Sequence, residues 1–149
     1  MCTYCGCESI HVIGRFMAEH DRLTDLTGPL RRAADAGDLP AAQEAAERIA
    51  ELLEPHTHAE ELGLFTMLRR EEHIADHVDD LCAEHDALDA QLARIRTGDL
   101  AGVDAFVRQL RNHMDRENNG LFPAAAIALG GPEWDEVDEL TPPAPTALG

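Results

Sequence analysis

Apolar side chains recur at alternating steps of three and four residues through most of the chain, and this spacing is typical of helices that share a core. The pattern lapses at short stretches rich in Gly, Asp and Pro, which indicate turns. The chain is therefore expected to be all-α, with four helices packed as an up-down-up-down four-helix bundle. These helices are predicted over about residues 8–36, 38–70, 72–96 and 101–128.

Turn residues limit these segments. Gly28-Pro29 predicts a kink or a short break inside the first helix, because proline has no backbone N–H to donate. Gly37-Asp38 and Thr97-Gly98-Asp99 predict turns, and Gly130-Gly131-Pro132 is expected to end the last helix. The chain then divides into a Cys-rich segment (1–7), a helical bundle (8–128) and an acidic, Pro-containing tail (129–149) with little fixed structure.

Composition agrees with a helical protein and limits its partners. Ala, Leu, Glu and Arg dominate the 149 residues, and aromatic residues make up only 4%. The formal charge is −17, and so negative a surface repels nucleic acid and anionic membranes. No apolar stretch approaches the ~20 residues that a membrane span needs, and no signal peptide is expected. We therefore expect a cytoplasmic protein whose four cysteines are reduced by default.

A ten-residue motif, H-x-x-x-E-x-x-G-L-F, occurs twice, from His56 to Phe65 and from His113 to Phe122. A histidine and a glutamate four residues apart lie on the same face of a helix. Glu19-His20-Asp21 also matches Glu84-His85-Asp86, and the separation of matching segments shrinks by about one helical turn at each step along the chain. The sequence therefore predicts an internal pseudo-two-fold duplication of a helical hairpin.

Six residues of these matching segments fall on the apolar faces of the predicted helices. A single buried histidine is more often a hydrogen-bonded core residue than a metal ligand. Two carboxylates buried without Lys or Arg are costly, however, and a metal cluster removes that cost because it binds neutral imidazoles and anionic carboxylates. The candidate metal ligands are His20, His56, Glu60, His85, His113 and Glu117.

The type of ligand limits the metal. Imidazole and carboxylate without thiolate suit iron, manganese or zinc. Six such ligands exceed what one tetrahedral zinc ion needs, so they suit two metal ions that each bind two histidines. Glu60 and Glu117 would bridge the ions. At this point iron, manganese and zinc all remain open.

These motifs, in this order over residues 8–128, resemble the hemerythrin-like family, the HHE cation-binding domains. Its pattern is a histidine on helix 1, H-x-x-x-E on helix 2, a histidine on helix 3 and H-x-x-x-E/D on helix 4. The resemblance implies a four-helix bundle with a non-haem di-iron centre. We therefore predict two iron ions, with a solvent-derived oxo or hydroxo group that completes the core. The ferritin-like bundles use Glu-x-x-His instead, so they fit less well.

The chain departs from the oxygen-carrying hemerythrins on the third helix, where they place an H-x-x-x-H pair. Leu81 and Asp89 stand four residues to either side of His85, and His77 lies about two turns before it. His77 is kept as a candidate outer ligand, although ~12 Å of helix separates it from His85. The missing fifth histidine argues against simple reversible oxygen carriage.

Three functions compete. The first is binding or sensing of a small oxidant such as O2, NO or peroxide. The second is an oxidoreductase that consumes peroxide, and the third is iron storage or iron sensing. No catalytic acid, base or nucleophile is recognised beside the cluster, which favours binding; a redox partner and the oligomeric state are left open. Apolar residues expected to keep the pocket dry are Ile13, Phe16, Leu52, Leu81, Leu88 and Leu110.

The cysteines near the start form a separate candidate site. Cys2, Cys5 and Cys7 have a C-x-x-C-x-C spacing that suits a soft metal, a redox disulfide or three free thiols. No second C-x-x-C completes a zinc ribbon, so His11 or Cys82 would have to contribute. This cluster is not part of the hemerythrin pattern. Elsewhere, His58 is expected in solvent and Glu61 at the edge of the bundle.

Overall fold

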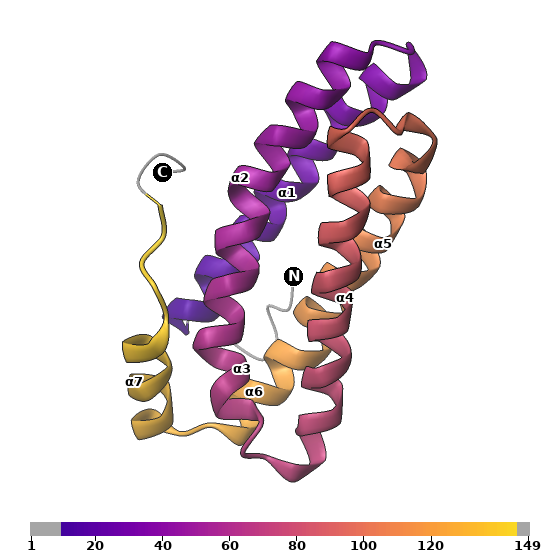
Figure 1. Cartoon of the computed structure of the whole chain (residues 1–149). Helices are drawn as coiled ribbons and strands as arrows, with labels where there is room; N and C mark the ends of the chain where they lie inside the picture. Colours follow the sequence, from indigo (N-terminus) through magenta and orange to yellow (C-terminus); the bar gives the residue numbers. More distant parts are fainter. Residues whose placement is uncertain (1–9, 146–149) are drawn as a thin grey trace.

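The computed structural model describes residues 10–145, and all regular secondary structure within them is helical (Figure 1). The all-α prediction is therefore confirmed for this part of the chain. The elements in chain order are α1 (His11–Asp35), α2 (Leu39–Leu62), α3 (Leu64–Leu68), α4 (Glu72–Arg96), the 3₁₀ turn η2 (Leu100–Gly102), α5 (Val103–Arg116), the π-helical turn η3 (Glu117–Leu121), α6 (Phe122–Ala128) and α7 (Gly131–Leu140).

The long helices lie side by side, and their contacts close a ring (Figure 1). Helix α1 packs on α2, α2 on α4, α4 on α5, and α5 on α1. The apolar core inside this ring forms two clusters, one toward each end. In α1, Phe16 and Met17 belong to one cluster and Leu23 to the other, and His20 lies between them. A polar layer therefore separates two apolar ones.

Glycines form the tight turns between the first two helices and between α4 and α5. Gly37 has φ +68° and Gly98 has φ +111°, which is backbone that a residue with a Cβ rarely adopts. Asp38 then caps α2, because its side chain accepts the backbone N–H of Ala41 at 3.2 Å. Both predicted turns are confirmed.

Of the kink or short break predicted at Gly28-Pro29, the break is wrong, since α1 continues through Pro29 to Asp35. One predicted helix boundary is also wrong. The second helix was expected to reach residue 70, but α2 ends at Leu62 and α3 begins at Leu64. A Cβ on the intervening Gly63 would collide with the hydroxyl of Thr141, so only glycine lets this later segment pack so closely.

The segment after residue 128 also differs from the expectation of little fixed structure. Helix α7 forms there, begins with Pro132 in its first turn, buries Val137 and packs against α3. The indole Nε1–H of Trp134 donates to the backbone oxygen of Leu129 at 3.2 Å. A few apolar residues at helical spacing outweigh the acidic, proline-rich composition.

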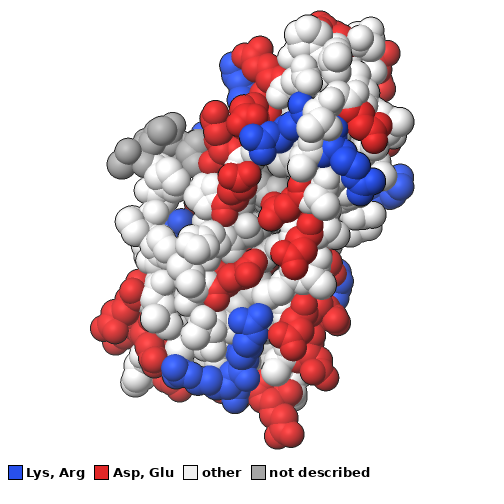
Figure 2. Space-filling model, viewed as in Figure 1, with Lys and Arg blue, Asp and Glu red and all other residues white. Residues whose placement is uncertain are grey.

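Acidic side chains spread over the visible surface, and arginines gather in a few places among them (Figure 2). This agrees with the formal charge of −17. Among the helices of residues 10–145, none is long and apolar enough to span a bilayer.

Candidate metal centre

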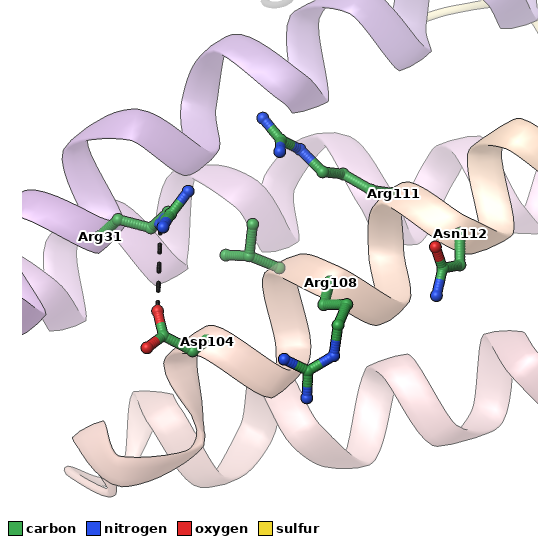
Figure 3. A pocket seen from close by; sticks show the side chains of 6 residues that line it. Arg31, Asp104, Arg108, Arg111 and Asn112 are labelled. Carbon is green, nitrogen blue, oxygen red and sulfur yellow. Dashed lines mark ion pairs between the residues drawn. The ribbon is translucent and has the colours of Figure 1, made fainter.

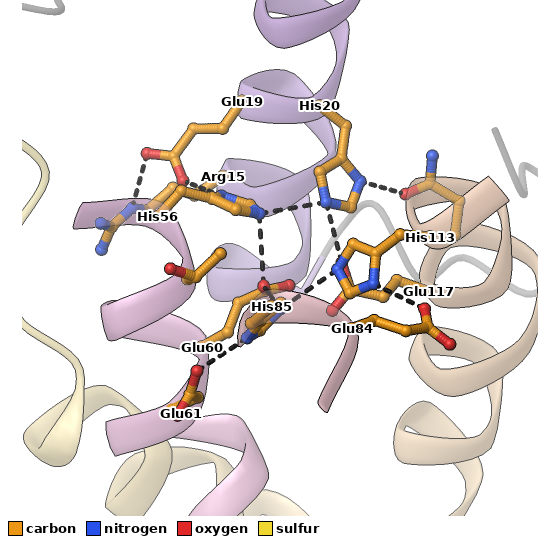
Figure 4. A network of polar contacts seen from close by, with 12 residues as sticks. Arg15, Glu19, His20, His56, Glu60, Glu61, Glu84, His85, His113 and Glu117 are labelled. Carbon is orange, nitrogen blue, oxygen red and sulfur yellow. Dashed lines mark hydrogen bonds and ion pairs between the residues drawn. The ribbon is translucent and has the colours of Figure 1, made fainter. Parts of the chain in front are cut away.

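The polar layer holds the six candidate ligands. Each of the helices α1, α2, α4 and α5 contributes one histidine, and the glutamates come from α2 and η3 (Figure 4). All six side chains point inward, and none is more than 3% exposed. The residues that the structure brings together here are His20, His56, Glu60, His85, His113 and Glu117.

The first half of the site, defined by His20 and His56, joins α1 to α2. The two Nε2 atoms lie 3.1 Å apart. Glu117 Oε1 lies 3.0 Å from His20 Nε2, and Glu60 Oε1 lies 3.3 Å from His56 Nε2. These four residues can each direct one ligand atom at a common point, because the atoms all lie within 4.8 Å of one another.

The second half, defined by His85 and His113, repeats this arrangement between α4 and α5. The two Nε2 atoms are again 3.1 Å apart. Glu60 Oε1 lies 3.2 Å from His85 Nε2, and Glu117 Oε1 lies 3.3 Å from His113 Nε2. Glu60 and Glu117 thus belong to both groups of ligand atoms, so each carboxylate lies between the two halves.

The outer ring nitrogen of each histidine is fixed by a hydrogen bond at the edge of the bundle. Each Nδ1 lies 2.7–2.9 Å from a side-chain oxygen. The acceptors are Glu19 for His56, Asn118 for His20, Glu61 for His85 and Glu84 for His113.

These hydrogen bonds decide the tautomer of the neutral rings. An Nδ1–H that donates outward leaves the Nε2 lone pair facing inward. Lone pairs on nitrogens 3.1 Å apart repel one another, and all four oxygens of Glu60 and Glu117 are buried without a hydrogen-bond partner among the described residues. A cation in each half would satisfy both groups, so the residues present fit a pair of metal ions.

Aromatic rings cover the histidines. Phe65 stacks on His85 with centroids 5.6 Å apart and 10° between the rings, and Phe122 stacks on His20 at 5.8 Å and 12°. Phe16 meets the His56 ring edge-on at 5.4 Å. The G-L-F ending of the motif therefore places each phenylalanine on a histidine of the other half.

Burial and neighbouring charges shift the pKa values of the ligands in the metal-free protein. Burial lowers the pKa of His56 to about 4 and also lowers that of His85. Burial, followed by the charge of Glu117, raises the pKa of Glu60 well above its usual range. Burial would also raise the pKa of Glu117, but His113 and His20 outweigh it and hold that pKa well below normal. Metal-free, the pair of carboxylates favours one proton on Glu60.

Two solvent-facing cavities reach the site. One of about 410 Å³ includes His20, Arg111 and Asn118 in its lining, and one of about 320 Å³ includes His113 and Glu84. A third, of about 350 Å³, lies farther along α1 and α5, where Arg31 pairs with Asp104 at 3.9 Å (Figure 3). Polar side chains border all three cavities. The six apolar residues expected near the metals are buried, and one of them, Leu88, also lines the cavity beside His113.

The family model described as Hemerythrin HHE cation binding domain matches residues 11–125. The chain belongs to this family. The matched range contains all six buried ligand candidates, so the hemerythrin-like resemblance seen in the motifs is confirmed. Comparison with curated proteins and with solved structures finds no match.

Other sequence candidates lie elsewhere in this hemerythrin-like domain. His77 is in neither group of ligand atoms, and its ring lies near Gly120. His58 is exposed, as expected, and His11 is exposed as well. The proposed thiol site of Cys2, Cys5 and Cys7 lies outside the described residues.

Sequence reasoning missed the side chains that support the ligands. Glu61 does lie at the bundle edge, with 40% of its side chain exposed, yet it also holds His85. Each supporting oxygen stands next to a ligand in the sequence: two precede a histidine and two follow a glutamate. The repeat contained this signal, because Glu19 matches Glu84, and Glu61 occupies the motif position of Asn118.

Proposed function

We propose that this hemerythrin-like chain holds two non-haem iron ions and binds or senses a small oxidant, namely O2, NO or peroxide. His20 and His56 would hold one ion and His85 and His113 the other, with Glu60 and Glu117 shared between them. When bound, such a pair of ions supplies a reversible change of redox state and a coordination position for the oxidant.

The observation that carries this proposal is the set of inward-facing lone pairs. Four imidazole nitrogens and two carboxylates meet in a buried layer where the described residues place no Lys or Arg among them. Buried carboxylates without partners are destabilising unless a cation compensates them. Six oxygen and nitrogen donors without sulfur suit iron, and two shared carboxylates suit two ions.

The chain's own residues orient the ligands and keep water out. Four outward hydrogen bonds fix the imidazole rings, so the Nε2 atoms stay directed inward. The rings of Phe16, Phe65 and Phe122 are fully buried against the histidines. The cavities beside His20 and His113 offer a small molecule two approaches.

The architecture supports two ions as well. We interpret it as an up-down-up-down four-helix bundle built from two related hairpins, α1–α2 and α4–α5. This interpretation rests on the matched contacts of the two halves. Phe65, which follows the first hairpin, stacks on His85 of the second, and Phe122, which follows the second hairpin, stacks on His20 of the first. Glu60 and Glu117 each belong to both groups of ligand atoms. A doubled hairpin supplies a doubled ligand set.

Binding is favoured over catalysis by the state of the neighbouring carboxylates. Glu19, Glu61 and Glu84 each accept a hydrogen bond from a histidine Nδ1, so none of the three is directed at the centre as an acid or base.

The test is an optical and kinetic one on protein loaded with iron. We expect two irons per chain, near-ultraviolet absorption from a bridged ferric pair, and a single-turnover spectral change when the reduced protein meets O2, NO or peroxide. Glu117→Ala should abolish the change. Sustained turnover of peroxide would instead make the protein an enzyme, and no response to any of the three would overturn the proposal.

A further inference from the structure

The two halves of the site differ at one supporting residue. The Nδ1–H of His85 donates to the carboxylate of Glu61 at 2.7 Å, whereas the Nδ1–H of His20 donates to the amide oxygen of Asn118 at 2.8 Å. Glu61 directly follows the shared Glu60, and Asn118 directly follows the shared Glu117. The same structural position therefore carries a carboxylate in one half and a neutral amide in the other.

The remaining supports are balanced between the halves. The second histidine of each half is held by a carboxylate, Glu19 for His56 and Glu84 for His113. Each of these carboxylates pairs with an arginine, Arg15 and Arg116 respectively. Among the residues that hydrogen-bond the histidines, the charge that distinguishes the halves is thus the carboxylate of Glu61.

A carboxylate that accepts from a ligating histidine makes the imidazole a stronger donor to a cation than an amide does. Its charge also attracts the cation directly. Changes of such supporting groups typically alter metal affinity about 10–100-fold.

We propose that the two ion positions are inequivalent, with Glu61 making the His85–His113 position the tighter one, so that it fills first. The inference rests on the proposed two-ion site. At limiting metal the chain would carry a single ion in the second half, and the complete pair would form only when the His20–His56 position also fills. Glu61 and Asn118 are positioning residues in this scheme.

The test uses Zn²⁺, which needs no redox chemistry, and protein labelled with ¹⁵N at histidine. We expect two binding steps whose dissociation constants differ about tenfold or more. In the first step the nuclear magnetic resonance signals of His85 and His113 should shift, and those of His20 and His56 only in the second. Simultaneous shifts, or the reverse order, would overturn the proposal.

Variants separate the charge from the hydrogen bond. Glu61→Gln keeps an acceptor oxygen but removes the charge, so it should weaken the first step and bring the two dissociation constants together. Its matched control is Glu51→Gln, an exposed residue of the same helix that should leave both steps unchanged. Glu61→Asp, which retains the charge, should restore part of the difference.

Exchange of Glu61 and Asn118 is the most discriminating test. Glu61→Asn with Asn118→Glu should restore two separated steps with the order of filling reversed. Asn119→Glu adds the same charge one residue away on an exposed side chain and should not change the order. Unchanged order in the exchanged protein would contradict the role of Glu61. Binding of fewer than two Zn²⁺ by the unaltered chain would instead refute the two-ion site itself.

Discussion

The first half of the site, on α1 and α2, and the second half, on α4 and α5, present the same ligands in different surroundings. In both halves two Nε2 atoms lie 3.1 Å apart, and a phenylalanine from the other half covers one ring. The surroundings differ, since Phe16 meets His56 in the first half and Glu61 supports His85 in the second. The ligand geometry is thus shared, while the electrostatics are specific to each half.

The backbone in the second part of each motif differs more than the side chains do. In the first half the helix ends at Leu62, and Gly63 lies against Thr141 beside α7. In the second half the chain continues through the π turn η3, where Gly120 is exposed. Both backbone paths bring a phenylalanine onto a histidine of the other half. Two different local structures, a helix break and a π turn, thus place Phe65 and Phe122 equivalently.

The largest effect is expected from the residues that the halves share. Glu60→Ala and Glu117→Ala should each reduce the metal content from two ions to one or none, because each removes a ligand from both groups. The loaded protein would lose ion-dependent stabilisation, about 4 kcal/mol where the free ion is at 1,000 times its dissociation constant. Elemental analysis and thermal unfolding with and without chelator measure both effects.

Glu60→Ala should in addition stabilise the metal-free protein, because it removes a carboxylate that is buried without a hydrogen-bond partner among the described residues and whose pKa is raised by burial and by Glu117. This variant should therefore be less stable than the unaltered chain when metal is bound and more stable when it is absent. A loss of stability in the metal-free protein as large as in the loaded one would show that Glu60 serves the fold rather than a metal.

The next effect concerns pH and the first half. In the metal-free protein the pKa of His56 falls from 6.5 to about 4, so the unfolded chain binds its proton at a higher pH than the folded one. This histidine therefore lowers stability as pH decreases from 6.5 to 4, by on the order of 3 kcal/mol.

Glu60 acts in the opposite direction, because its raised pKa favours the folded state in acid and loses that contribution as pH rises. The measurement therefore compares two proteins. The free energy of unfolding by denaturant is measured across pH 4–7 for the metal-free protein and for metal-free His56→Gln. The variant should lack the acid-dependent loss due to His56. Parallel pH profiles would contradict the assignment.

The aromatic covers come third. Phe65→Leu and Phe122→Leu should each cost about 1–2 kcal/mol of unfolding free energy, because each loses a stacked ring and leaves a small cavity. Phe122→Leu should cost more, since Phe122 also stacks on Phe16 at 6.2 Å. Chemical denaturation of the two variants checks the order, and a larger loss in Phe65→Leu would contradict it.

The arginines that hold the supporting glutamates should matter least. Arg15→Gln should cost about 1 kcal/mol, because Arg15 is largely buried, pairs with Glu19 and donates to the backbone oxygen of Pro142 at 2.7 Å. Arg116→Gln should cost less than ~0.5 kcal/mol, since this arginine is more exposed. Thermal unfolding of the two variants at low and high salt measures the two losses of stability. Equal losses in Arg15→Gln and Arg116→Gln would contradict an effect of burial.

Helical periodicity and the repeated motif were enough to predict an all-α chain, the turns at Gly37 and Gly98, and the family. They also selected the six residues that converge, because ligands spaced along a buried face remain on that face when helices pack. Whether these six bind metal stays a prediction.

The supporting residues could not be found in the same way. Glu19, Glu61 and Glu84 reach histidines of neighbouring helices, and such contacts depend on how the helices are rotated against one another. Helix α7 and the close contact at Gly63 are likewise set by tertiary packing, which a composition rich in acid and proline conceals.

The number of irons per chain tests the shared site most directly. Protein reconstituted with ferrous iron in the absence of oxygen, freed of unbound metal and analysed for iron against protein concentration should contain two irons per chain. A content of one or less at saturation would contradict a centre in which Glu60 and Glu117 serve two ions.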